Sequence, residues 1–174
     1  MKKKYIIIIL IIFVVCIIGY GTYSLFTGNI SLNNIIKTGN VDLEVIENKD
    51  ENNFIIKPGD ILDKTISIKN TGKHPIYVRA KVIITVDNKE LTSGEINVNV
   101  DNTKWIYSNG YYYYSKALNS NAVSENLFTK IYIDIFKIDN SYSGKKFNIR
   151  VLAQGVQSEN NGDDPIEAFG WPNE

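Results

Sequence analysis

Residues 76–87, IYVRAKVIITVD, alternate between two kinds of side chain with a period of two. Apolar residues occupy the even positions from Val78 to Val86, while residues such as Arg79 and Lys81 occupy odd positions. Successive side chains of a β-strand point to opposite faces of its sheet. The alternation therefore predicts a strand with one buried face.

The same alternation returns along the chain, with turn signals between the segments. Pro58-Gly59-Asp60 is one such signal, and Asn109-Gly110 between two aromatic runs predicts a type I′ hairpin. A single short helix is predicted at the C-terminus, where Asp164-Pro165-Ile166-Glu167 combines an N-cap residue with proline at the first helical position. We therefore predict an all-β fold, a two-sheet antiparallel β-sandwich of jelly-roll or immunoglobulin-like topology. The other predicted strands cover residues 41–45, 62–68, 96–100, 105–107, 111–114, 131–136 and 147–154.

The N-terminus carries the features of an export signal, because Lys2–Lys4 precede residues 5–18, which are apolar throughout. A helix of this length spans about 21 Å, which is less than the roughly 30 Å hydrocarbon core of a bilayer. A signal peptide is therefore favoured over a complete span. Small side chains at the −3 and −1 positions predict cleavage by a signal peptidase between Ser24 and Leu25. The competing interpretation is an uncleaved helical anchor from Tyr5 to Phe26.

These features divide the chain into three parts. Residues 1–24 form the signal peptide or signal anchor, residues 25–38 form an N-terminal segment, and residues 39–174 form the β-sandwich domain. We expect the protein to contact the membrane through residues 5–18 before cleavage. The mature protein is expected to be secreted, at the cell surface or in the extracellular matrix, and to remain membrane-anchored if cleavage does not occur.

Composition argues against several classes of function. The chain has 19 basic and 19 acidic residues, and three of the basic residues precede residue 5, so the mature part is mildly acidic. Such a domain lacks the basic surface expected of a nucleic-acid-binding protein. Cys16 is the only cysteine and His74 the only histidine. We therefore predict no disulfide, no catalytic residues, no bound metal and no cofactor, with His74 structural or facing solvent.

Two segments are candidate binding sites. Residues 160–164, NNGDD, offer oxygen ligands of the kind Ca²⁺ prefers, but they lack EF-hand spacing, and a solvated loop is favoured. Tyr111, Tyr112, Tyr113 and Tyr114 place two tyrosines on each face of the predicted hairpin. They are a candidate surface for contact with a sugar or a partner, and the alternative is packing against the strand of Trp105.

Several short blocks of this sequence resemble the camelysin/TasA family of exported surface and biofilm-matrix proteins, in their order along nearly the whole chain. The resemblance implies a jelly-roll-like sandwich and processing by a dedicated signal peptidase. For fibre-forming members it also implies assembly in which an N-terminal strand completes the next subunit. The blocks are residues 21–27 (GTYSLFT), 39–43 (GNVDL), 57–60 (KPGD), 68–72 (IKNTG), 76–80 (IYVRA), Trp105 with 110–114 (GYYYY), 156–157 (VQ) and 168–171 (AFGW).

Camelysin itself is classed as a metalloprotease, so the resemblance also raises a secreted protease as an alternative function. This sequence has no recognisable set of zinc ligands, and we therefore expect a protein that is not an enzyme. A membrane-anchored ligand-binding module that uses the tyrosine hairpin is a third possibility. Casein cleavage would identify the protease, and fibres of the mature protein would identify a structural role.

The favoured hypothesis is a structural surface or matrix protein that self-associates into oligomers or fibres. The segment that precedes the first confident strand has alternating apolar residues and no proline, so it can pair with an open sheet edge as a donor strand. The residues assigned to this assembly strand are Leu25, Phe26, Ile30, Leu32, Ile35 and Ile36.

Overall fold

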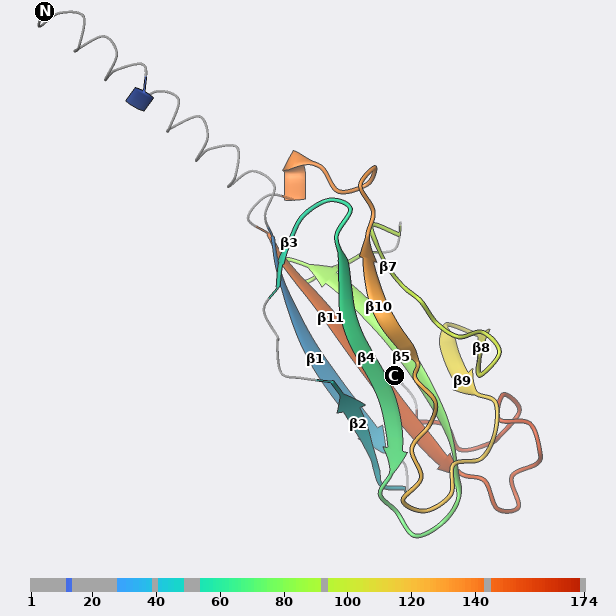
Figure 1. Cartoon of the computed structure of the whole chain (residues 1–174). Helices are drawn as coiled ribbons and strands as arrows, with labels where there is room; N and C mark the ends of the chain where they lie inside the picture. The colour runs from blue at the N-terminus through green and yellow to red at the C-terminus, as the bar shows by residue number, and fades with distance from the viewer. Residues whose placement is uncertain are drawn as a thin grey trace, which may run out of the picture.

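The computed structural model describes residues 12–13, 28–38, 41–48, 54–91, 94–142 and 145–172. Figure 1 shows an elongated domain in which two β-sheets pack face to face. Apart from one short 3₁₀ turn, η1 (Asn140–Tyr142), and residues 12–13, its regular elements are strands. The strands are β1 (Gly28–Thr38), β2 (Leu43–Glu47), β3 (Phe54–Ile56), β4 (Ile61–Asn70), β5 (Ile76–Val86), β6 (Lys89–Glu90), β7 (Ile96–Val98), β8 (Trp105–Ser108), β9 (Tyr111–Tyr114), β10 (Phe128–Ile133) and β11 (Lys146–Gln157).

The larger sheet has the order β3-β1-β11-β5-β9-β8, with β6 paired to β5, and the smaller sheet has the order β2-β4-β10-β7. All of these neighbours are antiparallel except β1 and β11, which run parallel. The predicted β-sandwich of antiparallel strands is therefore confirmed in outline, with this one parallel pair as the difference. Parallel neighbours require a long crossover connection, and here most of the domain lies between the two strands.

The core lies between the sheets and is built from both. Ile66, Ile68 and Ile131 come from the smaller sheet, and residues such as Val78 and Ile149 come from the larger one. Each of these five side chains is almost completely buried. The even positions of β5 thus face the core, as the alternation of residues 76–87 predicts, and this burial is the main favourable contribution to folding.

The Asn109-Gly110 hairpin is confirmed in backbone detail. Asn109 has φ 48° and Gly110 has φ 82°, and both residues of a type I′ turn require a positive φ. The flanking strands are in register, with Ser108 opposite Tyr111 and Trp105 opposite Tyr114.

The predicted strand at residues 131–136 is wrong at both ends, because β10 begins at Phe128 and ends at Ile133. The Asp134 side chain accepts a hydrogen bond from the Phe136 amide at 2.8 Å, and the Asp134 carbonyl accepts one from Ile138 at 3.1 Å. An aspartate that caps its own turn in this way competes with strand pairing. The apolar residues after Asp134 therefore lie in a turn.

The predicted short C-terminal helix is also wrong. Asp164 caps a single turn, since its side chain accepts from the Ile166 amide and its carbonyl accepts from Glu167. The next backbone groups bond elsewhere: the Asn161 amide side chain both donates to the Phe169 carbonyl and accepts from the Phe169 amide. A helix this short is costly to nucleate. The two hydrogen bonds between Asn161 and Phe169 end it after one turn.

Candidate functional site

The segment predicted to be an assembly strand lies mostly in β1. This strand pairs with β11 along almost its whole length, from Asn29 opposite Lys146 to Thr38 opposite Gly155. Ile30, Leu32, Ile35 and Ile36 belong to β1, and Leu25 and Phe26 lie outside the described residues. The sequence suggested an unpaired segment, whereas the structure pairs residues 28–38 within the chain's own sheet.

Among the described residues, the other edge of β1 is paired at its start. β3 pairs with Gly28, Asn29 and Ile30, and the part of the chain that the structure describes places no further strand along Ser31–Thr38. Most of the pairing of β1 is therefore with β11, along one edge of the strand. Unpaired backbone N–H and C=O groups along a strand edge can accept another chain.

The predicted signal junction at Ser24 and Leu25 lies outside the described residues, as does all of residues 5–18 except Ile12 and Phe13. Ile12 and Phe13 are helical. Among the described residues, no helix is long and apolar enough to cross a membrane.

The four tyrosines of β9 lie mostly in the interior. Tyr111, Tyr113 and Tyr114 are buried, and Tyr112 is half-buried. Tyr114 packs on Trp105 with ring centroids 5.1 Å apart, which is the packing that the sequence offered as the alternative to a binding surface. Tyr112 packs against the exposed Tyr107 at 4.9 Å. Of the predicted tyrosine contact surface, only Tyr112 with its neighbour Tyr107 remains accessible.

Sequence reasoning missed a cluster on the outer face of the larger sheet. Arg79 lies over the Tyr111 ring at 3.9 Å and the Trp171 ring at 4.7 Å. Its guanidinium donates to Gln154 Oε1 at 2.7 Å, to the Tyr113 hydroxyl at 3.1 Å and to the Pro172 carbonyl at 3.2 Å. The alternation of residues 76–87 assigns Arg79 to the non-core face, but the C-terminal segment covers that face.

The pKa is raised at Tyr112 and at Tyr142. Burial raises the pKa of the Tyr112 phenol, and the nearby Tyr107 adds to the effect. At Tyr142, desolvation raises the pKa, and a hydrogen bond to Glu95 Oε1 at 3.2 Å raises it further. A raised pKa means that folding favours the protonated phenol.

This linkage predicts a loss of stability in alkali. The contribution of Tyr112 and Tyr142 is fully present below the pKa of about 10 of an unfolded tyrosine, and it is lost as the pH rises through the folded-state pKa. The urea midpoint should therefore fall as the pH rises above about 10, as measured by circular dichroism. The Tyr142→Phe variant should show a flatter decline. An equal decline in this variant would assign the effect to other groups.

The remaining candidate residues form no cluster. His74 is exposed in the turn before β5, and its Nδ1 lies 3.7 Å from Glu159 Oε2. In the loop considered for Ca²⁺, Asp164 caps the turn that follows it. The described residues include no group of three or more histidine, cysteine, aspartate or glutamate side chains that could hold a metal ion.

Comparison with known proteins gives one match. The family model described as camelysin metallo-endopeptidase matches residues 1–106, which reach from the N-terminus to the start of β8. No curated protein and no solved structure matches the chain. The matched region covers more than half of the sequence and includes the blocks quoted above from residues 21–27 to 76–80. The chain therefore belongs to the camelysin family.

Proposed function

We propose that this protein is an exported structural component of the cell surface or matrix, and that it self-associates by exchanging strand β1 between copies. The observation that carries the proposal is the parallel pairing of β1 with β11 over Asn29–Thr38. β1 follows the expected cleavage site within a few residues, so cleavage would leave it as a chain terminus. A terminal element that completes its own sheet can complete the sheet of a second copy with the same contacts, which is the basis of domain swapping.

Exchange differs from simple addition of a free strand. Because β1 already occupies the edge of β11, a copy must first release its own β1 before it accepts another. Before cleavage the front of β1 is continuous with the apolar segment, which restricts that release. Each exchanged strand restores the same backbone bonds it broke, so chains linked head to tail gain length with little change in contact energy.

The decisive experiment uses register partners as a covalent lock. Ser31 and Asn148 are partners across β1 and β11, and neighbouring strands lie about 4.8 Å apart, within the range that a disulfide bridges. The mature Ser31→Cys/Asn148→Cys protein should stay monomeric when oxidised and form fibres or oligomers when reduced. Electron microscopy and light scattering measure both states.

The matched control moves one cysteine out of register. Ser31→Cys/Gln157→Cys shifts the second cysteine along β11 by about 30 Å to an exposed position, so oxidation should leave assembly unchanged. A mixture of Ser31→Cys chains with Asn148→Cys chains should give covalent dimers only when assembly occurs. Deleting residues 25–38 should abolish assembly. Fibres from the oxidised, locked protein would refute strand exchange.

We also propose that the protein is not a protease, although the family takes its name from a metallo-endopeptidase. The support is the single histidine of the chain, His74, which lies exposed in a turn. The same mature preparation should leave casein intact. Chelator-sensitive cleavage that disappears in His74→Ala would favour the protease instead.

A further inference from the structure

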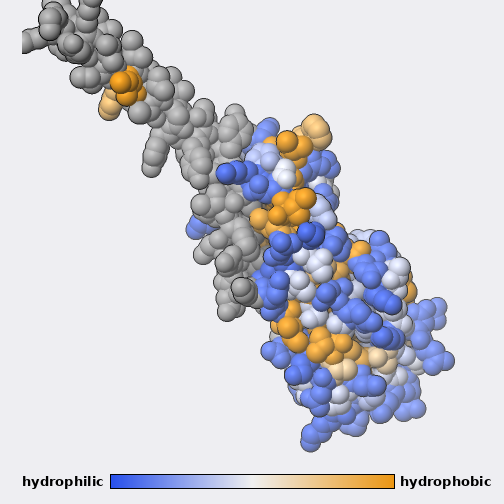
Figure 2. Space-filling model, viewed as in Figure 1, coloured by the Kyte–Doolittle hydropathy of each residue, from blue (hydrophilic) through white to orange (hydrophobic). Residues whose placement is uncertain are grey.

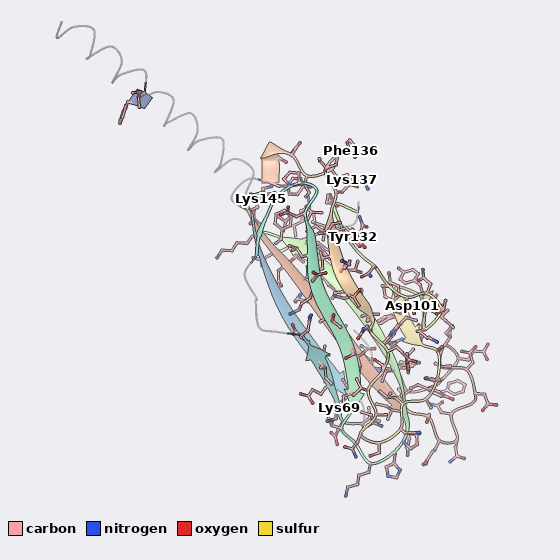
Figure 3. The ribbon with its side chains drawn as sticks, viewed as in Figure 1. Lys69, Asp101, Tyr132, Phe136, Lys137 and Lys145 are labelled. Atoms are coloured by element: carbon pink, nitrogen blue, oxygen red, sulfur yellow. The ribbon has the colours of Figure 1, made fainter. Side chains whose placement is uncertain are left out.

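The end of the domain where β1 begins carries exposed apolar side chains. Phe136 is 95 % exposed and Ile135 is 58 % exposed, in the turn after β10. Ile61 and Tyr132 are opposite each other in β4 and β10 and are also exposed. Figure 3 labels Phe136 at the same end as Lys145, and Figure 2 shows apolar atoms at that end. We call Ile61, Tyr132, Ile135 and Phe136 the apolar tip.

The turn that presents the apolar tip is held from several sides. Asp134 Oδ1 accepts from the Phe136 amide, and the Asp134 amide donates to the Glu95 carbonyl at 2.9 Å. Ile133 exchanges hydrogen bonds with the Pro58–Asp60 turn, through Gly59 at 3.0 Å and Asp60 at 2.9 Å. The hydrogen-bonded turn therefore holds Phe136 in solvent next to Ile135, and a patch of exposed apolar side chains is typical of a contact surface.

A short chain of contacts joins the apolar tip to the start of β1. Gly28 pairs with Ile56, and Ile56 leads directly into the Pro58–Asp60 turn. A Cβ placed on Gly59 would lie 3.7 Å from Ile135 Cδ1, so this turn lies against the apolar tip. The chain N-terminal to Gly28 is thus attached beside the apolar tip.

We infer that the apolar tip contacts the lipid bilayer while the chain still carries its N-terminal segment. Residues 5–18 are expected to enter the membrane, and residues 19–27 reach at most about 30 Å when fully extended. Residues 19–27 therefore act as a tether that keeps this end of the domain near the bilayer, so the apolar tip has a high effective concentration at the lipid surface. Figure 3 labels Lys137 and Lys145 at this end. Asp60 and Asp134 also lie there, in the two hydrogen-bonded turns beside Ile133, so the contact depends on the apolar side chains and not on net charge.

The inference goes beyond self-association and does not depend on it. The long axis of the domain then points away from the membrane, and β1 and β11 both begin at the end near the bilayer. Given the rise per residue of a β-strand, the length of β11 places the opposite end of the domain about 36 Å from the apolar tip. Phe169 lies at that opposite end, where Asn161 bonds to both Phe169 and the Gln157 carbonyl at the end of β11.

Phe169 is 83 % exposed and provides the matched control. The full chain is reconstituted in phosphatidylcholine vesicles that contain brominated acyl chains, and only the carbonate-resistant fraction is measured. The added tryptophan of Phe136→Trp should be quenched several-fold more than the added tryptophan of Phe169→Trp. Trp105 and Trp171 give the same background in both variants, and neither substitution removes a buried side chain.

Two results would overturn the inference. Equal quenching of the two variants would place the apolar tip away from the lipid. A blue shift of the added fluorescence in Phe136→Trp without quenching would show that protein, and not lipid, covers the apolar tip. Neither result bears on the cysteine lock between β1 and β11, so failure here leaves strand exchange to its own test.

Discussion

Replacing Glu47 with alanine should lower the free energy of unfolding by about 3 kcal/mol, because the ammonium group of a buried lysine then loses its carboxylate. Lys64 is 1 % exposed in β4, and its Nζ forms an ion pair with Glu47 Oε2 on the neighbouring strand β2. The cost of breaking a buried pair is the desolvation of the charge that stays behind. Glu47 is 23 % exposed, which places the effect at the lower end of the range for buried pairs. Urea unfolding followed by circular dichroism measures the change.

The control removes both charges together. A Glu47→Leu/Lys64→Met protein keeps the approximate volume of the pair without its charges, so its stability should lie within about 1 kcal/mol of the natural chain. Exposed ion pairs give a second reference. Asp63→Ala, which breaks the exposed pair with Lys130, should cost less than about 1 kcal/mol. A Glu47→Ala protein as stable as Asp63→Ala would show that Lys64 reaches water in solution.

Replacing Arg79 with alanine should cost about 3 kcal/mol and should loosen the C-terminal segment, because a buried acceptor loses its charged donor. The substitution removes the stacking on Tyr111 and Trp171 and the hydrogen bonds to Gln154 and Pro172. Gln154 is fully buried, so its Oε1 would lose this donor without access to water. Hydrogen exchange should report faster exchange around residues 158–172, and urea unfolding should report the loss of stability.

Arg79→Lys is the matched variant, because it keeps the charge but loses the planar group that stacks and donates in several directions. It should recover less than half of the stability lost in Arg79→Ala. A lysine variant as stable as the natural protein would show that charge alone holds the C-terminal segment. Trp171→Ala should reproduce the faster exchange of residues 158–172, since the Trp171 ring also packs on Tyr113 at 5.6 Å.

The alternation along the chain was enough to predict the fold class and most strands. β5 matches residues 76–86 of the predicted strand, and the Asn109-Gly110 turn is where the dipeptide predicts it. Two errors arose where a side chain competes for backbone hydrogen bonds. Asp134 and Asn161 each capture nearby amides, so the first ends a predicted strand early and the second prevents a predicted helix. Such competition is decided by local geometry that a period of two does not record.

The assembly hypothesis was reached from the sequence, but the partner of the assembly strand was not. An apolar, proline-free segment after a signal peptide indicates a strand that can pair, and any open edge would satisfy that pattern. The position on β11 depends on which edge lies free once the other strands have paired. Residues far apart in sequence, such as Asn29 and Lys146, meet only at that stage.

By itself the sequence determined the all-β class, the two faces of each main strand and the family, because these depend on local periodicity and on short blocks of residues. Only the tertiary structure decided what covers the non-core face of the larger sheet. There the C-terminal segment returns over β5, β9 and β11, so that Arg79 and Tyr113, on the non-core face by their periodicity, pack against Trp171. Periodicity separates two faces of a strand, but whether the second face meets water or another segment depends on where the rest of the chain comes to lie.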